Sequence, residues 1–303
     1  MTGLGIDAGG SSTRWLLLDE SGTVIGQGKT EPITGHVFTP AGRRENLARL
    51  RGLLEAVLEL ARPDAVVGGV TGLHGDTEAA ALFVEEVAAG LELPETHVHL
   101  DNDMGIAYAS VFAPGEGILV YAGTGSVGYH LAADGQVVRA GGYGYLIDDA
   151  GAGYWLGHQG LKEVFRQFDE RGRPSESCLA QAFYQDLGSD DWDDLVGTVY
   201  GGGRSRVAAL APVVAGAANQ GDETAVAILE TAGQELARLA EVLVKRVGLL
   251  PVAFAGGISQ LSPLLTEAFR GALPAGVRLE VVRTEPVRAA ARQALKLARQ
   301  TES

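Results

Sequence analysis

The feature that most constrains this chain is a strand–turn–strand pattern that occurs twice. Residues 4–25 read LGIDAGGSSTRWLLLDESGTVI, and residues 118–138 read ILVYAGTGSVGYHLAADGQVV. Each begins with a short apolar run, passes through a turn rich in glycine, serine and threonine, and continues into a second apolar run. A tight glycine turn between two strands exposes several backbone N–H groups, which can form a concave site for phosphate oxygens. The repeat therefore predicts two related lobes and a bound nucleotide.

The remaining pattern predicts mixed α/β lobes. Strand meanders are followed by segments in which helical and strand patterns alternate, and apolar residues recur at helical spacing through 223–247. A loop is expected over 31–42. Strands are predicted at 3–7, 13–19, 23–29, 97–100 and 279–282, and helices at 45–62, 78–90, 223–247 and 286–299.

Composition narrows the class of protein. Of the 303 residues, 46% are hydrophobic and 20% are charged, which is typical of a globular chain long enough for two domains. The formal net charge of −14 argues against nucleic-acid binding, which needs a surface of lysine and arginine. No apolar run is long enough for a membrane helix, and the first strand begins too early for a signal peptide. The one cysteine, Cys178, fits a reducing cytoplasm and is expected to be a small buried side chain.

A dinucleotide-binding motif is the alternative interpretation of the second turn. Residues 123–128 read GTGSVG, and Asp148 follows 20 residues after Gly128. Such a motif needs a helix to begin at its glycines. Here Asp134-Gly135 instead separates two short apolar runs, which is typical of a hairpin. The sequence favours a second strand meander.

The doubled hairpin resembles the acetate and sugar kinase/heat-shock cognate/actin superfamily. The resemblance is most specific to the N-acetylglucosamine kinase-like sugar kinases, a branch shared with the activator ATPases of benzoyl-CoA reductase and 2-hydroxyacyl-CoA dehydratase. Five segments carry it, in family order: GIDAGGSSTRWLLLD at 5–19, DNDMGIAYA at 101–109, YAGTGSVGY at 121–129, GGYGYLIDDAGAGYWLG at 141–157 and VAFAGGIS at 252–259.

The resemblance implies the fold and the activity. It implies an α/β protein with two ribonuclease H-like lobes and a nucleotide cleft between them. The first lobe is expected over 1–112, with the helix at 287–303 packed back on it, and the second over 113–286 with a helical insertion. The implied activity is transfer of the γ-phosphate of ATP, with Mg²⁺, to the 6-hydroxyl of a hexose or amino sugar. N-acetylglucosamine, glucosamine and glucose are the expected substrates, and a cytoplasmic homodimer with no nucleic-acid or membrane partner is the expected form.

The resemblance also assigns the residues that bind the nucleotide. Asp7, at the end of the first strand, is expected to organise Mg²⁺ through water, although an aspartate in a turn can also simply bond to its own backbone. The family often has a basic residue at the Ser12 position, so this chain lacks that charge. The expected phosphate and adenosine contacts are Gly9, Gly10, Ser11, Ser12, Thr13, Gly123, Thr124, Gly125, Ser126, Ala217, Gly256 and Gly257.

Asp103 is assigned as the catalytic base. A carboxylate there can accept the proton of a sugar hydroxyl as that hydroxyl attacks the γ-phosphorus. The alternative is helix capping, because Asp101 and Asp103 come directly before a helical pattern. A metal site built from His97, His99 and the two aspartates is a further alternative, since alternate residues of a strand share a face.

The sugar contacts are where this chain departs from the family pattern. The resemblance assigns them to Gly35, His36, Asp103, Gly142, Tyr143, Gly144 and Asp149. The family's amide-bearing contact falls at Gly35, and a family glutamate falls at Ala150. Fewer polar groups discriminate less between close analogues, so we expect broader sugar tolerance than in a dedicated N-acetylglucosamine kinase.

Two other functions are compatible with a nucleotide-binding fold. An activator ATPase would need several thiolates for an iron–sulfur cluster, and one cysteine cannot supply them. A non-catalytic sugar sensor switched by a nucleotide is disfavoured by the presence of Asp103. Sugar-dependent release of ADP distinguishes a kinase from a sensor.

Overall fold

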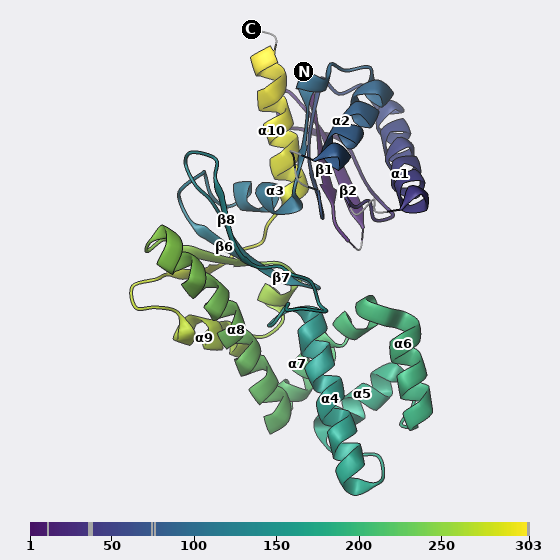
Figure 1. The fold of residues 1–303 in the computed structure, drawn as a ribbon, viewed down its shortest axis with the longest axis vertical. Helices are drawn as coiled ribbons and strands as arrows, with labels where there is room; N and C mark the ends of the chain where they lie inside the picture. Colours follow the sequence, from purple (N-terminus) through teal and green to yellow (C-terminus); the bar gives the residue numbers. More distant parts are fainter. Residues whose placement is uncertain (11, 36–38, 74, 76, 302–303) are drawn as a thin grey trace. The chain divides into compact units, whose positions relative to one another are not determined.

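The computed structural model divides into two compact units (Figure 1). It describes residues 1–301 except 11, 36–38, 74 and 76. Unit 1 comprises Met1–Phe112 and Thr284–Ser303, and unit 2 comprises Ala113–Arg283. Each unit has its own five-stranded sheet and its own apolar core.

The sheet of unit 1 combines an antiparallel meander with two parallel strands. Its strand order is β3-β2-β1-β4-β5, with β2 antiparallel to β1 and β3, and β4 parallel to β1 and β5. The parallel strands β1, β4 and β5 therefore end at one edge. The strands are β1 (Thr2–Ala8), β2 (Thr13–Asp19), β3 (Val24–Thr30), β4 (Ala65–Val70) and β5 (Val98–Asp101).

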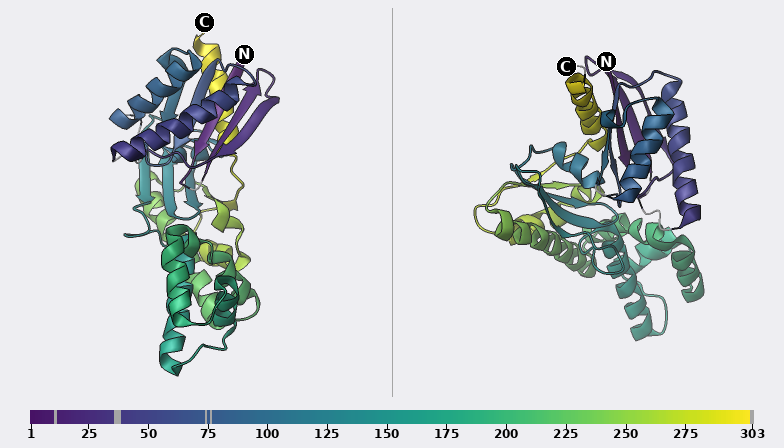
Figure 2. Two further views of the ribbon diagram at one scale, coloured as in Figure 1. Left: turned by 90° about the vertical axis from the view of Figure 1, so that its right-hand side faces the viewer. Right: turned by 45° about the horizontal axis from the view of Figure 1, so that its top comes forward.

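Helices cover both faces of this sheet. Leu4, Ile6 and Ala8 point to the face covered by α1 (Pro40–Leu58) and α2 (Glu78–Leu91), in one apolar cluster. Two of the alternate positions in β1, Gly3 and Gly5, are glycines, and there α10 (Pro286–Thr301) lies against the strand (Figures 1 and 2). A Cβ atom on Gly5 would lie 2.3 Å from the carbonyl oxygen of Val287, so only glycine admits this helix. Two shorter helices complete the unit, η1 (Glu95–His97) and α3 (Asp103–Ala109).

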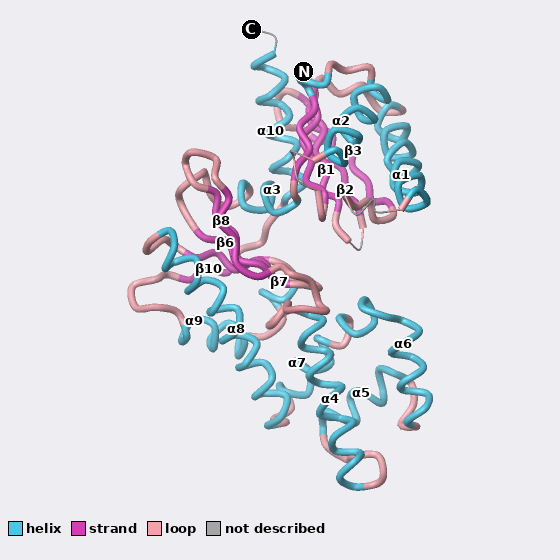
Figure 3. Tube along the Cα trace, viewed as in Figure 1, coloured by secondary structure: helices cyan, strands magenta, loops and turns pink. Residues whose placement is uncertain are grey.

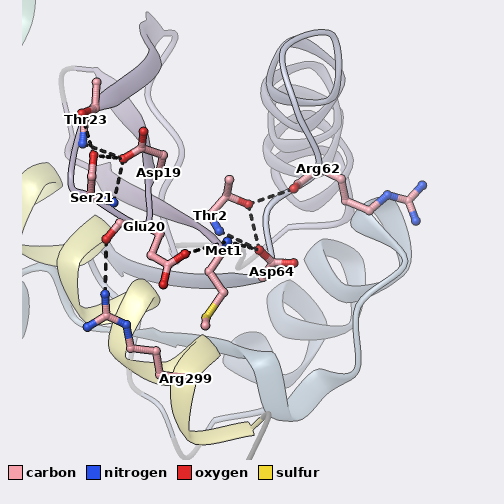
Figure 4. Close-up of polar contacts among 9 residues, drawn as sticks. All are labelled: Met1, Thr2, Asp19, Glu20, Ser21, Thr23, Arg62, Asp64 and Arg299. Atoms are coloured by element: carbon pink, nitrogen blue, oxygen red, sulfur yellow. Dashed lines mark hydrogen bonds and ion pairs between the residues drawn. The ribbon is translucent and has the colours of Figure 1, made fainter.

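Polar contacts fix the amino end of β1, opposite the edge where its carboxyl end lies (Figure 4). The Thr2 N–H donates to Asp64 Oδ2 over 2.6 Å, which ties β1 to the loop before β4. The carboxylate of Asp19 accepts three bonds from the turn that follows it. Arg299 of α10 donates to the Glu20 carbonyl over 3.3 Å. These contacts set the register of β1, and so the position of Asp7.

Unit 2 repeats the strand order of unit 1. Its sheet has the order β10-β9-β6-β7-β8, with β6, β7 and β8 forming the antiparallel meander and β9 and β10 parallel to β6. Figure 3 colours the strands of this sheet magenta and labels β6, β7, β8 and β10. The strands are β6 (Ile118–Ala122), β7 (Ser126–Leu131), β8 (Val137–Gly141), β9 (Val252–Ala255) and β10 (Leu279–Val281). Because a strand and not a helix follows the glycine turn, the dinucleotide-binding alternative is wrong.

The helices of unit 2 pack into one large apolar core with its sheet. Helix α8 contacts β6, β7 and β8, and α9 packs against α8. Segment 153–219, between β8 and α8, is helical. The helices are α4 (Gly153–Arg171), α5 (Cys178–Leu187), α6 (Trp192–Ala208), α7 (Ala211–Asn219), α8 (Glu223–Val247), η2 (Gly257–Gln260) and α9 (Pro263–Ala272).

The predicted α/β class, with two related lobes, is confirmed by these two matching sheets, and two local predictions are wrong. Helix α1 begins at Pro40, inside the expected loop, because Thr39 Oγ1 caps it by accepting the Gly42 N–H over 3.1 Å. Cys178 is exposed at the start of α5 and is not a core residue. In the described part of the chain, no helix has the length and apolarity that crossing a bilayer requires.

Candidate active site

A row of polar positions crosses the edge where the parallel strands of unit 1 end. Asp7 of β1 is in register with Gly69 of β4, and Gly69 is in register with Asp101 of β5. A Cβ atom on Gly69 would lie 2.6 Å from Asp103 Cα. The missing side chain therefore admits the start of α3 to this edge, where Asp103 comes close enough to Asp7 for the two charges to interact.

Asp103 is held by a neighbour that the sequence analysis did not single out. Thr71 Oγ1 donates to Asp103 Oδ2 over 2.5 Å, and the Thr71 N–H donates to the Ala8 carbonyl over 2.8 Å. The cap of α3 is Asn102, whose Oδ1 accepts the Met104 N–H over 3.0 Å. Because Asn102 provides the cap, the capping alternative for Asp103 is wrong.

Asp7 is in an environment that disfavours its charge. Burial raises the pKa of Asp7 from 3.8 to about 6; the nearby Asp103 carboxylate adds to this effect, and Arg14 opposes it. Arg14 is the cross-strand partner of Asp7 in β2. Asp7 and Asp103 together carry more negative charge than Arg14 can neutralise, so a divalent cation near them would stabilise the ionised carboxylates.

Asp101 has a structural role. Its Oδ1 accepts the N–H groups of Gly75, over 3.0 Å, and Asn102, over 2.7 Å, and so holds the loop after Thr71 against β5. The His97 ring bonds to the Asp64 carbonyl over 2.9 Å. Among the residues with described positions, no group of three or more histidine, cysteine, aspartate or glutamate side chains could hold a metal. The histidine–aspartate metal alternative is therefore unsupported there.

The first hairpin closes between Gly9 and Ser12. The Gly9 N–H donates to the Ser12 carbonyl over 3.0 Å, with Gly10 at the exposed tip. The predicted contact Ser11 lies outside the described residues. Thr13 is completely buried, and its Oγ1 accepts the Ile33 N–H over 2.9 Å. We therefore leave the Thr13 hydroxyl out of the nucleotide contacts that we propose below.

Gly35 lies where two loops of unit 1 approach each other closely. Its N–H donates to the Thr71 carbonyl over 2.9 Å, and a Cβ atom would lie 2.6 Å from the Leu73 nitrogen. No side chain fits there without moving the loop that carries Thr71. The backbone around Gly35 therefore leaves no room for the amide side chain that the resemblance places at this position. The other predicted sugar contact here, His36, lies outside the described residues.

The second hairpin is clamped by the first residues of α4. The N–H groups of Gly153 and Tyr154 donate to the carbonyls of Gly123 and Thr124, over 2.9 and 3.1 Å. The Gly123 N–H donates to the Gly125 carbonyl over 2.9 Å. Among described residues, the N–H groups of Thr124 and Gly125 find no protein acceptor. Two donors at the tip are thus available to an anion.

Asp149 lies beneath this hairpin. Its side chain is 4% exposed, and Oδ2 is 2.5 Å from the place of a Cβ on Gly125. Burial raises the pKa of Asp149. The charge of Arg204 and the hydrogen bonds from the Ser126 and Gly144 N–H groups lower this pKa and so oppose the effect of burial. The Ser126 hydroxyl donates to the Ala150 carbonyl over 2.9 Å. The structure therefore joins the predicted phosphate turn and the predicted sugar stretch through Asp149.

The rest of the predicted sugar stretch is an exposed turn. Gly142 and Gly144 have φ of +71° and +92°, which side-chain-bearing residues rarely adopt, and Tyr143 is 60% exposed. Tyr145 and Tyr154 form an edge contact with their ring centres 4.8 Å apart. This turn offers backbone groups and aromatic faces to a ligand.

The predicted adenosine residues differ in accessibility. Gly256 has φ of +94°, and a Cβ there would lie 2.3 Å from the Ala122 carbonyl oxygen, so only glycine fits beside β6. Gly257 opens η2, and no atom lies within 4 Å of where its Cβ would be. Ala217 is completely buried in α7, so we leave it out of the proposed nucleotide contacts.

Two residues of these sites have weak sequence signals. Thr71 directly follows a buried parallel strand, a place where polar ligand contacts gather. Arg204 follows three glycines in α6, far in sequence from the hairpin that it approaches. Thr71 could have been found from its position after a strand. Arg204 can be recognised only once the fold shows that it lies next to the hairpin.

The comparison with protein families decides the assignment. The family model described as the BadF/BadG/BcrA/BcrD ATPase family matches residues 4–286. The chain belongs to this ATPase family. The predicted family resemblance is therefore confirmed, and the hairpins of both units lie inside the matched segment.

Several proteins that are similar to this member of the ATPase family are named as sugar kinases. An N-acetylmuramic acid/N-acetylglucosamine kinase from Clostridium acetobutylicum is 28% identical over 279 residues, which cover 88% of each chain. An N-acetyl-D-glucosamine kinase from Dictyostelium discoideum is 27% identical over 282 residues, which cover 87% of each. A solved structure of a candidate N-acetylglucosamine kinase from Chromobacterium violaceum is 28% identical, with a TM-score of 0.72 and 98% of both chains covered.

Proposed function

We propose that this ATPase family member is a sugar kinase that transfers the γ-phosphate of ATP to the 6-hydroxyl of a hexose or amino sugar. The observation that carries the proposal is the Asp103 carboxylate, which Thr71 orients at the sheet edge and which is not used as a helix cap. A carboxylate held in this way can accept the proton of an attacking hydroxyl. The names of the two curated relatives support an amino sugar as the acceptor.

The hairpins are proposed to hold the phosphates. Free N–H groups at Thr124 and Gly125 favour an anion at the tip in unit 2, and Gly9 and Gly10 form the equivalent turn in unit 1. Fixed backbone donors stabilise phosphoryl charge without rearranging during the reaction.

Asp7 is proposed to organise Mg²⁺. Its partly buried carboxylate has a raised pKa and lies near a second carboxylate, so the residues present fit a divalent cation. A bound Mg²⁺ would neutralise phosphate charge. Asp7 itself would hold the water shell in place, and Asp103 would remain the proton acceptor.

The proposal is tested with a panel of sugars in an assay that couples ADP release to a spectroscopic signal. We expect turnover with N-acetylglucosamine, glucosamine and glucose, with values of kcat/KM that differ by less than about 10³-fold because polar contacts are few. Carbon and phosphorus NMR of the product should place the phosphate on the 6-oxygen. Absence of turnover with every sugar, or phosphate on another oxygen, would contradict the proposal.

A further inference from the structure

Asp149 lies where three segments of unit 2 meet. The turn of the second hairpin lies directly against its carboxylate, since Oδ2 is 2.5 Å from the place of a Cβ on Gly125. The exposed turn after β8 reaches the carboxylate through the Gly144 N–H, which donates to it. Helix α6 reaches it through Arg204, whose Nη2 lies 3.8 Å from Oδ2. One buried side chain therefore connects segments that are far apart in the sequence.

Arg204 reaches this carboxylate because of a kink in α6. Three glycines precede it, and Gly203 has φ of +56° and ψ of −151°, which breaks the helix. The chain can turn there because glycine adopts positive φ readily. The guanidinium carbon lies 5.1 Å from the centre of the Tyr145 ring, so an aromatic face and a carboxylate both hold the charge in place. The kink therefore places a counter-ion beside Asp149.

The Asp149 carboxylate is already occupied by protein partners. Its side chain is only 4% exposed, and the N–H groups of Ser126 and Gly144 donate to it. Arg204 compensates its charge. A sugar hydroxyl would have to enter a buried site and displace one of these partners, and a buried donor left unpaired costs free energy. These contacts are those of a side chain that holds backbone in place, which differs from the sugar contact that the resemblance assigns to Asp149.

The backbone that Asp149 holds is the phosphate turn, by which we mean residues 123–126. Ser126 closes this turn, and both of its polar groups bond to the segment that carries Asp149. Its N–H donates to the Asp149 carboxylate, and its hydroxyl donates to the Ala150 carbonyl over 2.9 Å. The two N–H groups at the tip, which precede Ser126, find no acceptor among the described residues. Asp149 therefore fixes the turn and leaves its tip donors to an anion.

We propose that Asp149 is a positioning residue for the phosphate turn of unit 2, that Arg204 is its counter-ion, and that Asp149 does not bind the sugar. This inference rests on the proposed binding of the ATP phosphates at this turn. A lone carboxylate against an anion site would repel phosphate, and the Arg204 charge offsets that repulsion. Fixed in this way, the tip donors keep their orientation before the nucleotide arrives.

The test measures the Kd for ATP by calorimetric titration without sugar, and the KM for N-acetylglucosamine at saturating ATP. Asp149→Asn keeps the shape of the side chain but removes the charge and one acceptor oxygen. It should raise the Kd for ATP about 10- to 100-fold, the range for hydrogen bonds to a charged group. Arg204→Gln should raise it about 10-fold, because it leaves a buried carboxylate uncompensated. The KM for the sugar should stay unchanged in Asp149→Asn.

The double variant Asp149→Asn/Arg204→Gln tests whether Arg204 acts through Asp149. Two residues that act as one pair have effects that do not add in free energy. The double variant should therefore weaken ATP binding by less than the product of the two single effects. Effects that multiply would assign Arg204 to the phosphate directly and would overturn its role as a counter-ion.

The matched control is Asp148→Asn, at the neighbouring residue. Asp148 pairs with Arg238 over 3.1 Å and accepts the Ala150 N–H over 3.1 Å, so this change removes the same charge without a bond to the phosphate turn. The Kd for ATP should stay unchanged. Thermal unfolding checks that each variant is folded. Arg204→Gln, at a side chain that is 42% exposed, keeps the test informative if Asp149→Asn does not fold.

Three results distinguish this inference from its competitors. An unchanged Kd for ATP with a raised KM for the sugar in Asp149→Asn would assign Asp149 to the sugar and overturn the inference. A lower melting temperature with both constants unchanged would give Asp149 a role in stability alone, which also overturns it. An unmodified protein that does not bind ATP would refute the proposed function itself.

Discussion

The two units share a strand order but differ in the charges that they place around their hairpins. In unit 1, Asp7 precedes Ala8 at the end of β1, and Asp103 lies nearby. In unit 2, Tyr121 holds the place before Ala122, and Arg204 approaches the turn instead. The repeated backbone provides N–H groups in both. Two nearby carboxylates in unit 1, and a buried carboxylate paired with an arginine beside aromatic rings in unit 2, therefore suit different ligand atoms.

The two hairpins are also held differently. The turn of unit 2 is fixed through its carbonyls by the start of α4, a 19-residue helix. The turn of unit 1 is followed by Thr13, whose hydroxyl holds the loop at Ile33. The comparison shows that a duplicated scaffold determines where backbone donors lie. Segments outside the repeat, such as α3 and α6, determine the chemistry around them.

The largest expected effect is a loss of turnover when the proposed base in unit 1 is removed. Asp103→Asn in unit 1 should lower kcat about 10²- to 10⁴-fold and leave the Kd for ATP nearly unchanged, because the carboxylate accepts a proton and holds no phosphate. Steady-state kinetics and calorimetric titration with ATP measure the two quantities. Asp101→Asn is the matched control, since an amide oxygen can still accept the bonds of Gly75 and Asn102. Near-normal turnover of Asp103→Asn with the correct sugar would contradict the role of Asp103.

The second effect is the loss of folding stability that results from ionising the buried Asp7 carboxylate of unit 1. The pKa of Asp7 is raised from 3.8 to about 6, so the folded state binds its proton more tightly than the unfolded state. The contribution of Asp7 to the free energy of unfolding should therefore fall by up to about 3 kcal/mol as pH rises from about 4 to 6, and then level off. Asp7→Asn should remove this fall and be more stable than the unmodified protein at pH 7, while losing activity.

Urea unfolding at pH 4.0, 5.0, 6.0 and 7.5 measures this difference, without nucleotide or Mg²⁺. Arg14→Gln is the informative companion, because Arg14 opposes the shift and its loss should steepen the fall. An Asp7→Asn variant that is less stable at pH 7 than the unmodified protein would show that the ionised carboxylate stabilises the fold.

A smaller effect is expected at the tip in unit 2. In Gly125→Ala, the new Cβ would lie 2.5 Å from Asp149 Oδ2 and 3.3 Å from Arg204 Nη2, which displaces the turn. We expect ATP affinity to fall about 10- to 100-fold, as for losing one or two hydrogen bonds to a charged group. Gly123→Ala is the control in the same turn, because its Cβ would have its nearest contact at 3.7 Å. If the two variants bind ATP with equal affinity, the turn in unit 2 does not contact the nucleotide and has only a structural role.

The smallest effect tests how Asp103 is oriented. Thr71→Val keeps the shape of the side chain but removes the hydroxyl that donates to Asp103. We expect kcat to fall about 10-fold, consistent with the loss of one charge-assisted hydrogen bond. Thr71→Ser keeps the hydroxyl and should restore most of the rate. If serine and valine variants have equal kcat, the hydroxyl does not position the base.

Much of this fold could be predicted from local signals. The two meanders were visible because a glycine turn between apolar runs is a local pattern, and 223–247 was visible from its helical spacing. The start of α1 was missed because its signal, Thr39 before Pro40, lies inside a stretch rich in loop-forming residues. Local composition there outweighed the capping signal.

The candidate site was predictable where it lies next to a motif. Asp7, Asp103 and Gly125 follow strands or turns that carry the family pattern. The contacts of Thr71 and Arg204 depend on which strands are neighbours and on a helix kink, and a linear pattern contains neither. The burial of Asp149 and Ala217 was equally hidden, because exposure is decided by packing between distant segments.

The most direct test of the central claim is the amount of ADP formed with and without sugar, at saturating ATP and Mg²⁺. A sugar kinase forms one sugar phosphate for each ADP, and ADP formation stops when the sugar is omitted. We predict this coupling with an amino sugar, and its loss in Asp103→Asn. Equal ADP formation with and without sugar, or nucleotide binding with no ADP formation in the presence of any sugar, would contradict the account.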